Sequence, residues 1–241
     1  MDRAVVLLSG GIDSTVCATL AVGEYGNDNV MGLSFKYGQK HDRELQAAAK
    51  VASELGIRRH KFLDVTPVFE ESVTHLLRDR GDIPSVSYEE LRKSHGPSPM
   101  YVPFRNGVFL SMAVSFALQR DAEFIYYGAH AEDSYNWAYP DCTPEFNGSI
   151  ASAAYIGTYH KVRLVTPLQW MTKSEIVGLG IRIDAPLKYT YSCYRGSLLH
   201  CGTCATCVSR IEAFKKQQAV DPVEYMIDIV WPYDDHYNLT I

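Results

Sequence analysis

Short apolar runs alternate with helix-like stretches along most of the chain. The run at residues 4–8 is apolar and ends in a glycine turn, and residues 14–25 after it are typical of a helix. Two further strands are predicted at residues 30–37 and 60–64, and between them apolar residues recur at helical spacing over residues 41–55. A strand-helix-strand series of this kind predicts an α/β fold, in which a parallel sheet carries helices on both faces.

The alternation continues after an irregular segment. Residues 78–105 contain two glycines and four prolines, which predict a long loop with at most a short helix at residues 88–93. Loops of this length in compact domains often act as lids or ligand-binding loops. The elements predicted beyond it are a helix at 106–119, a strand at 124–127, a loop at 128–146, a helix at 149–160, a strand at 162–165, and helices at 172–180 and 208–216.

Composition and charge narrow the class of protein. The chain has 241 residues, with 23 Lys and Arg against 28 Asp and Glu, so its formal net charge is -5 and it has no general basic field for a nucleic acid. We therefore expect no direct nucleic-acid contact. Its longest apolar run, residues 108–118, is shorter than the roughly 20 residues of a membrane-spanning helix. Six cysteines without a secretion signal indicate a reducing compartment, so we expect a cytoplasmic protein that does not associate with membranes.

A glycine-rich turn joins the first predicted strand to the first predicted helix. Its sequence is Leu8-Ser9-Gly10-Gly11-Ile12-Asp13-Ser14. Paired glycines let the backbone approach an oxyanion closely, and the helix N-terminus favours negative charge, so this turn predicts a phosphate site. Its spacing matches neither the Walker loop nor the dinucleotide-binding fingerprint. The alternative is a plain strand-to-helix turn.

Four of the six cysteines lie close together near the C-terminus. They are Cys193, Cys201, Cys204 and Cys207. Four thiolates on tight turns predict a closed, structural Zn²⁺ site, and the alternatives are a four-iron, four-sulfur cluster or a disulfide. We expect a zinc-binding helical segment over residues 191–241, packed on a nucleotide- and substrate-binding domain over residues 1–190. Of the other two, Cys17 is expected to be a small buried residue and Cys142 to line a pocket.

The glycine-rich turn resembles the signature loop of the ATP-pyrophosphatase (PP-loop) family, Ser-Gly-Gly-x-Asp-Ser. Members of this family bind ATP and release pyrophosphate while they adenylate a substrate. The resemblance implies that Mg²⁺ helps to neutralise the leaving pyrophosphate, and that Asp13 and Ser14 take part in catalysis. It further implies that the phosphates of ATP are bound by Ser9, Gly10, Gly11, Asp13 and Ser14, and that Leu8 also belongs to the ATP site.

Further segments resemble one branch of that family, the 7-cyano-7-deazaguanine synthases of the queuosine and archaeosine pathways. The matching segments keep the family order and cover nearly the whole chain. They are Tyr37-Gly38-Gln39-Lys40-His41, Val102-Pro103-Phe104-Arg105-Asn106, Ala131-Glu132-Asp133, Tyr139-Pro140-Asp141-Cys142, Thr166-Pro167-Leu168, Lys173-Ser174-Glu175, and Ser192-Cys193-Tyr194 through Cys207. The resemblance implies an ATP-dependent ligase that converts 7-carboxy-7-deazaguanine and ammonia into the nitrile through adenylated intermediates, with pyrophosphate and AMP released.

The resemblance also implies roles for residues in these segments. Gln39 and His41 are expected to bind ATP, and Arg105 and Lys173 to contact its phosphates as catalytic cations, although either cation could instead form a surface ion pair. A carboxylate facing the N1–H and the exocyclic amine of guanine would make two charge-assisted hydrogen bonds. The sequence does not say which carboxylate does so, and a solvated acidic loop is the alternative. The expected substrate-binding residues are Asn106, Glu132, Asp133 and Asp141.

Two features depart from the family pattern. The segment at residues 133–139 is longer than in the usual family pattern, and Thr143 occupies a position where we expect Arg. Both lie in the expected substrate pocket, where Tyr135, Trp137 and Tyr139 could stack on the base. The alternative function is therefore a related ligase that stops at the amide or joins the deazaguanine carboxylate to an amine of another molecule, including a protein.

Two hypotheses come from other classes. A PP-loop enzyme acting on tRNA would need a basic surface or an added RNA-binding domain, and the sequence has neither. A zinc-binding interaction module without catalysis would bind ATP without turnover.

Aromatic residues in the tail after Asp221 are typical of an oligomer contact, such as that of a homodimer.

Overall fold

The structure, a computed structural model, describes residues 3–40, 42–77 and 98–232. The short helix expected at residues 88–93 and the expected ATP-binding residue His41 lie outside these ranges. Among the described residues, no helix is both long and apolar enough to cross a membrane.

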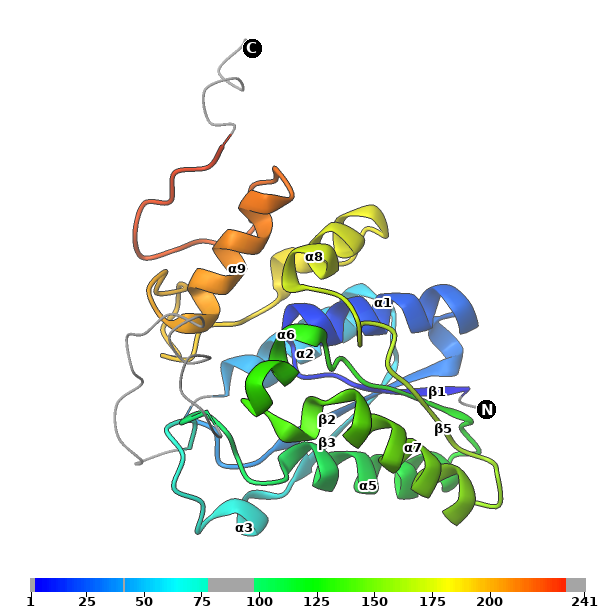
Figure 1. Cartoon of the computed structure of the whole chain (residues 1–241). Coiled ribbons are helices and arrows are strands. Elements are labelled where there is room, and N and C mark those ends of the chain that lie inside the picture. The colour runs from blue at the N-terminus through cyan, green and yellow to red at the C-terminus, as the bar shows by residue number, and fades with distance from the viewer. Residues whose placement is uncertain (1–2, 41, 78–97, 233–241) are drawn as a thin grey trace.

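A five-stranded parallel sheet lies at the centre of the molecule (Figure 1). In space the strands follow the order β3-β2-β1-β4-β5, and every neighbouring pair is parallel. The order reverses at β1, because β2 pairs with one of its edges and β4 with the other. Ligands of such folds bind beyond the carboxyl ends of the strands at this reversal. The strands are β1 (Ala4–Leu7), β2 (Val30–Lys36), β3 (Arg59–Asp64), β4 (Phe124–Tyr126) and β5 (Arg163–Val165).

Helices cover both faces of the sheet, which confirms the predicted α/β class. One face carries α1 (Ile12–Tyr25), α2 (Arg43–Glu54), α8 (Lys173–Arg182) and α9 (Ala205–Lys216), and the other carries α5 (Arg105–Leu118) and α7 (Pro144–Gly157) (Figure 1). The short elements are α3 (Thr66–Phe69), α6 (Ala131–Ser134), and the 3₁₀ turns η1 (Asn27–Asn29), η2 (Tyr135–Trp137), η3 (Pro140–Cys142) and η4 (Leu187–Tyr189).

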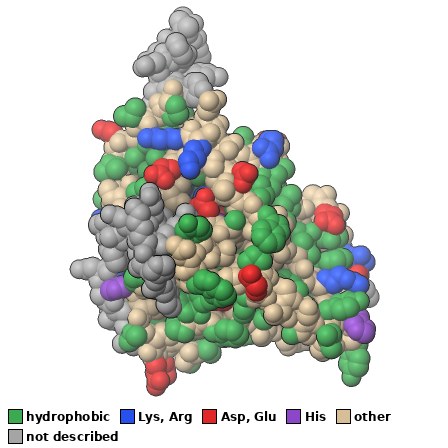
Figure 2. Space-filling model, in the orientation of Figure 1, with side chains coloured by type: hydrophobic (Ala, Val, Ile, Leu, Met, Phe, Trp, Pro, Cys, Tyr) green, Lys and Arg blue, Asp and Glu red, His purple; other side chains and the backbone are tan. Residues whose placement is uncertain are grey.

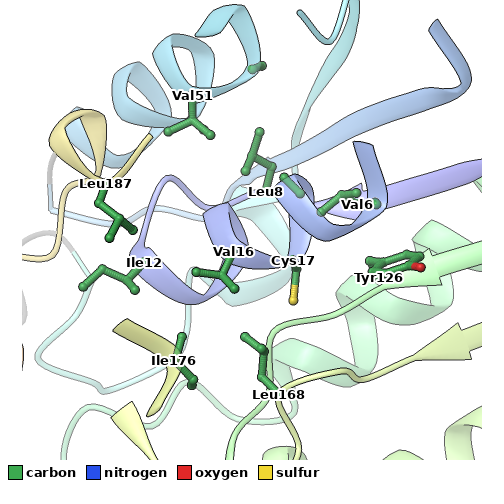
Figure 3. Packing of buried hydrophobic residues seen from close by; sticks show 14 of the residues in the cluster. Val6, Leu8, Ile12, Val16, Cys17, Val51, Tyr126, Leu168, Ile176 and Leu187 are labelled. Carbon is green, nitrogen blue, oxygen red and sulfur yellow. The ribbon is translucent and has the colours of Figure 1, made fainter. Parts of the chain in front are cut away.

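The first hydrophobic core surrounds α1. Val16 and Cys17 on this helix are fully buried against Val6 of β1, Leu168 and Ile176 (Figure 3). The prediction that Cys17 is a small buried residue is confirmed, and burial raises the pKa of its thiol, so the group stays neutral. This packing fixes the start of α1 against the carboxyl end of β1.

The second core lies between the opposite face of the sheet, α5 and α7. Phe35 of β2 stacks on Phe109 of α5, with ring centroids 4.1 Å apart. The α7 helix begins at Pro144 rather than at the predicted residue 149, because Thr143 caps its N-terminus by accepting a hydrogen bond from the backbone N–H of Phe146. Thr143 is thus the helix cap in the position where the family pattern led us to expect Arg.

The C-terminal segment packs on the first core. Ala213 and Phe214 of α9 belong to the same buried cluster as α1. Arg210, also on α9, is 0% exposed and donates two hydrogen bonds to the Asp221 carboxylate, at 2.6 and 2.8 Å. Such a buried pair is stable only when its remaining polar atoms are also satisfied, and Arg210 donates further to Thr190. The domain boundary at residue 190 stays a prediction.

Candidate active site

The glycine-rich turn lies at the carboxyl end of β1, where the strand order reverses. Gly10 has a φ of +85°, and a Cβ there would lie 2.4 Å from the Glu44 carbonyl oxygen and 2.6 Å from the Ala48 nitrogen. Only glycine fits, because both contacts are to the backbone of α2. Gly11 is the N-cap of α1 and, lacking a side chain, leaves the first N–H groups of this helix without a side-chain acceptor. A helix N-terminus in this state is an anion site.

Two serine hydroxyls complete the turn. The Ser9 and Ser14 oxygens lie 3.0 Å apart, and the Ser14 oxygen accepts a hydrogen bond from the Ser9 backbone N–H at 3.2 Å. The Ser14 hydroxyl also reaches the Gly11 carbonyl oxygen at 3.1 Å. These bonds hold the loop in one conformation before any ligand binds.

Asp13 and Lys173 form an ion pair at the mouth of this turn. The Lys173 Nζ lies 2.7 and 2.6 Å from the two carboxylate oxygens of Asp13. Burial alone would raise the pKa of the Asp13 carboxyl, but Lys173 and then His130 act against burial and hold that pKa below its usual value. Asp13 is therefore a carboxylate throughout the neutral range.

The position of Lys173 is set by a capping box. Thr172 caps α8, the Thr172 hydroxyl and the Glu175 backbone N–H share one hydrogen bond, and the Glu175 carboxylate accepts from the Thr172 backbone N–H at 2.7 Å. Lys173 is the first residue of α8, where the helix dipole disfavours a cation. The Asp13 carboxylate offsets this unfavourable position, so the ion pair connects α8 to the start of α1.

His130 lies behind this pair. It is 4% exposed, and its Nε2 is 3.3 Å from an Asp133 carboxylate oxygen and 3.9 Å from Asp13. Among the described residues, the buried Nδ1 of His130 has no hydrogen-bond partner. His130 is not among the predicted site residues, because a single sequence does not distinguish it from other loop residues.

Arg105 lies on the opposite side of the cavity, as the first residue of α5. Its guanidinium donates a hydrogen bond to the Tyr37 hydroxyl at 3.1 Å and lies over the Tyr37 and Phe109 rings. Burial acts to lower the pKa of Arg105, but the interactions with Tyr37 and Asp141 act in the opposite direction and outweigh it. The pKa of Arg105 is therefore raised overall, and the side chain stays a cation. The geometry holds Arg105 toward the cavity rather than in a surface ion pair.

Asp141 holds the start of α5. Its carboxylate accepts a hydrogen bond from the Asn106 backbone N–H at 2.9 Å, while the Asn106 amide contacts the Cys142 sulfur at 3.2 Å. Burial raises the pKa of the Asp141 carboxyl, against the Asn106 hydrogen bond and Arg105, which lower it. Asp141 is 3% exposed and does not line the cavity, so it acts on the site by fixing Asn106.

These elements enclose one cavity of about 290 Å³, near the lower end of the range for small-molecule sites. Gly10 and Asp141 lie behind its wall, and Cys142 lines it, as expected. Among the aromatic residues proposed to stack on a base, Tyr139 lines the cavity, whereas Tyr135 and Trp137 are 59% and 62% exposed. The expected site residues in the wall are Leu8, Ser9, Gly11, Asp13, Ser14, Gln39, Arg105, Asn106, Glu132, Asp133 and Lys173. Their individual roles stay predictions.

Several lining residues were not expected from the sequence. Glu44 of α2 lies in the wall, and so does Ser34 of β2, whose hydroxyl is 2.7 Å from the His60 Nε2. The C-terminal segment also contributes to the wall through Tyr191, Ser192, Tyr194, Thr206 and Ser209. The backbone N–H of Tyr191 donates to the Gly10 carbonyl oxygen at 2.9 Å, which ties this segment directly to the glycine-rich turn.

The four clustered cysteines are buried, and their sulfur atoms all lie within 4.8 Å of one another. Backbone N–H groups of Cys201 and Cys204 donate to sulfur atoms of the cluster at 3.4 and 3.2 Å, which suits thiolates. Cys204 caps α9 and Cys207 lies in its first turn, where the helix dipole favours negative charge. Four sulfur ligands in this arrangement fit a metal ion that prefers thiolates.

The tail after Asp221 partly differs from expectation. Trp231 packs against the first core and under the Lys215 ammonium, so this aromatic residue contacts its own chain. Within the part of the tail that the structure describes, residues 222–232, the large apolar side chains that are exposed are those of Met226, Ile227 and Val230. A homodimer stays a prediction.

Comparison with known proteins shows which family this chain resembles. The family model described as "Queuosine biosynthesis protein QueC" matches residues 3–218. The 7-cyano-7-deazaguanine synthase of Koribacter versatilis is 46% identical over 92% of this chain and 93% of its own length. That of Marinomonas sp. is 39% identical over 93% of this chain and 98% of its own length.

One solved structure that matches is less similar in sequence. An NH3-dependent NAD synthetase from Campylobacter jejuni is 16% identical, with a TM-score of 0.45 over 77% of this chain and 66% of its own. That likeness is too low to carry an argument. The family model and the relatives, by contrast, cover nearly the whole chain, which therefore belongs to the queuosine biosynthesis protein QueC family.

Proposed function

We propose that this protein is an ATP-dependent ligase that converts 7-carboxy-7-deazaguanine and ammonia into 7-cyano-7-deazaguanine. The observation that carries the proposal is identity of 39% to 46%, over more than nine tenths of the chain, with proteins named 7-cyano-7-deazaguanine synthase. A cavity with an anion-binding turn and two fixed cations is what an adenylating enzyme needs.

The phosphates of ATP would bind at the glycine-rich turn. N–H groups at the start of α1 and the Ser9 and Ser14 hydroxyls would donate to phosphate oxygens. Lys173 would stabilise the charge that develops on the leaving pyrophosphate, and Arg105 would do so from the opposite wall. Both cations are held by protein partners before ATP arrives, which limits the reorganisation needed during the reaction.

The reaction proceeds by two activations of the same carbon. The substrate carboxylate attacks the α-phosphorus of ATP, pyrophosphate leaves, and an acyl-adenylate forms. Ammonia then attacks the acyl carbon and displaces AMP, which gives the amide. The amide oxygen then attacks the α-phosphorus of a second ATP and pyrophosphate leaves; loss of that oxygen with AMP and of both N–H protons gives the nitrile. Adenylation serves both steps because AMP is a far better leaving group than hydroxide.

The deazaguanine ring would lie against the part of the wall formed by α6 and the start of α5. Glu132 and Asp133 offer carboxylates in the wall, and Asn106 offers an amide. Asp133 is also close to His130, which fixes its orientation. We assign to Glu132 and Asp133 the hydrogen bonds that the N1–H and the exocyclic amine of the deazaguanine would donate. Asp141 would hold Asn106 in place through the hydrogen bond from the Asn106 backbone N–H.

The two metal ions would have separate tasks. Mg²⁺ would be bound by phosphate oxygens together with the Asp13 carboxylate, and would neutralise the leaving pyrophosphate. Zn²⁺ would be held by Cys193, Cys201, Cys204 and Cys207. With four protein ligands it has no open position, so it would stabilise the segment that walls the cavity.

Charged side chains of both signs are mixed on one face of the molecule. Figure 2 shows acidic and basic side chains interspersed over the face drawn, without a continuous basic stripe, as expected from the net charge of -5. Four reduced thiols at metal-binding distance suit the reducing cytoplasm, where we place the enzyme.

The test is exchange of labelled pyrophosphate into ATP, with and without 7-carboxy-7-deazaguanine and in the absence of ammonia. We expect exchange that depends on the deazaguanine acid, because adenylation precedes attack by ammonia. Exchange that is absent, or that is unchanged without the acid, would contradict the proposed substrate.

A further inference from the structure

One carboxylate in the cavity wall has no task in the reaction described above. Glu44 lies in the first turn of α2, half-buried, and its backbone carbonyl oxygen approaches Gly10 of the phosphate turn. Its position is therefore fixed relative to the site where the adenylate forms. No hydrogen bond or ion pair from any described residue reaches the Glu44 carboxylate.

The surroundings of Glu44 change the pKa of its carboxyl group. Burial raises the pKa of the Glu44 carboxyl to about 7, against the Arg105 guanidinium, which lowers it. Arg105 is held by the Tyr37 hydroxyl rather than by Glu44. From the same helix, Arg43 is directed away and donates to the Gly196 carbonyl oxygen at 2.9 Å.

The carboxylate nearest the phosphate turn differs from Glu44 in being paired. Across the phosphate turn, the Asp13 carboxylate is paired with Lys173. A structural role would have given Glu44 a partner, since an unpaired carboxylate in a partly desolvated wall is unfavourable. A group of this kind, facing a cavity, is a candidate for proton transfer or for binding a small cation.

The proposed reaction supplies such a cation. Ammonia at neutral pH is almost entirely ammonium, which has no lone pair and cannot attack an acyl carbon until it loses a proton. We propose that Glu44 binds the ammonium ion and takes a proton from it, so that ammonia forms beside the acyl-adenylate. This inference rests on the proposed function and adds the site of its nitrogen substrate.

The proton balance of this step is complete. The Glu44 carboxylate takes one proton from ammonium, and the nitrogen lone pair forms the C–N bond at the acyl carbon. The tetrahedral adduct then breaks its bond to the AMP oxygen, and a second proton leaves the nitrogen with the AMP phosphate. Glu44 returns its proton to water before the next ammonium ion binds.

The experiment compares the wild type, Glu44→Gln and Glu44→Asp, with Glu54→Gln as the matched control on an exposed position of the same helix. Adenylation is measured by pyrophosphate exchange, and nitrogen transfer by amide formation from ammonium or hydroxamate formation from hydroxylamine. Hydroxylamine is mostly neutral at pH 7 and needs no base before it attacks. We expect Glu44→Gln to lower kcat/KM for ammonium by about 10²- to 10⁴-fold.

The same variant should keep pyrophosphate exchange and hydroxamate formation within about threefold of the wild type, since neither requires the base. Glu44→Asp should restore part of the ammonium reaction, and Glu54→Gln should match the wild type. Equal losses with both nucleophiles, or no loss with ammonium, would overturn the proposal. Intact exchange also shows that the variant is folded.

A pH series on the wild type tests the same point without depending on a variant. With Glu44 as the base, the rate at fixed total ammonium levels off above about pH 7. Without a base in the site, the rate rises about tenfold per pH unit until ammonium itself titrates. A continued rise in the wild type would overturn the role of Glu44, whereas absence of deazaguanine-dependent exchange would overturn the proposed function instead.

Discussion

Replacing Lys173 by Met would separate the phosphate-binding role of this cation from its role in the fold. The variant keeps a side chain of similar length but leaves Asp13 as an unpaired carboxylate at the entrance to the glycine-rich turn. A charged hydrogen bond contributes about 1.5–3 kcal/mol, which corresponds to a loss of roughly 10- to 150-fold in kcat/KM for ATP. Without Lys173, the negative charge of Asp13 is unpaired and repels the triphosphate. This repulsion adds to the loss and favours the upper part of that range.

The assay is pyrophosphate exchange over a series of ATP concentrations, with Lys161→Met as a matched control at an exposed position. The Lys173 and Asp13 side chains are only 17% and 23% exposed, so the variant leaves a largely buried, unpaired carboxylate, and a thermal melt checks that the protein is still folded at the assay temperature. The control should match the wild type. A folded Lys173→Met variant with less than a threefold change in kcat/KM for ATP would refute a phosphate contact at this position.

Three further predictions concern the frame of the site. Gly10→Ala should lower the free energy of unfolding by roughly 2–4 kcal/mol in urea titrations, because φ is +85° there and a Cβ meets the α2 backbone at Glu44; a loss below about 0.5 kcal/mol would contradict this. Cys201→Ser should lower the metal content measured by elemental analysis and weaken ATP binding, because Tyr191 of the same segment hydrogen-bonds Gly10; unchanged metal content would refute the site. Burial lowers the pKa of His60 to about 4, so between about pH 6.5 and pH 4 the unfolded chain binds a proton at His60 that the folded chain does not bind. The free energy of unfolding should therefore fall as the pH drops through this range. His60→Phe should flatten this part of the curve of free energy against pH, and an unchanged slope would contradict the role of His60.

The strands and the phosphate turn could be predicted from local sequence. β1 and β2 are short, mostly apolar runs, whereas the edge strand β3 is largely polar, and the turn between β1 and α1 is a contiguous motif whose residues are neighbours in the fold as in the chain. The predicted start of α7 is too late, because the cap Thr143 and the following Pro144 lie within the predicted loop at residues 128–146. Both residues are ordinary helix-start signals.

The contacts that complete the site could not be predicted in the same way. Lys173 and Asp13 are 160 residues apart, and nothing in either segment names the other as its partner. Glu44 reads as one more polar residue of an amphipathic helix, since only the packing of α2 on Gly10 turns it to the cavity. The cysteine cluster was expected from its spacing, whereas its position in the cavity wall depends on the bond between Tyr191 and Gly10.

The most direct test of the account is the identity of the product. The protein is incubated with ATP, Mg²⁺, 7-carboxy-7-deazaguanine and ammonium labelled with heavy nitrogen, and the base is analysed by mass spectrometry. We predict the nitrile, carrying one labelled nitrogen, with AMP and pyrophosphate released. The unchanged acid, or the amide as the final product, would contradict the assignment as a 7-cyano-7-deazaguanine synthase.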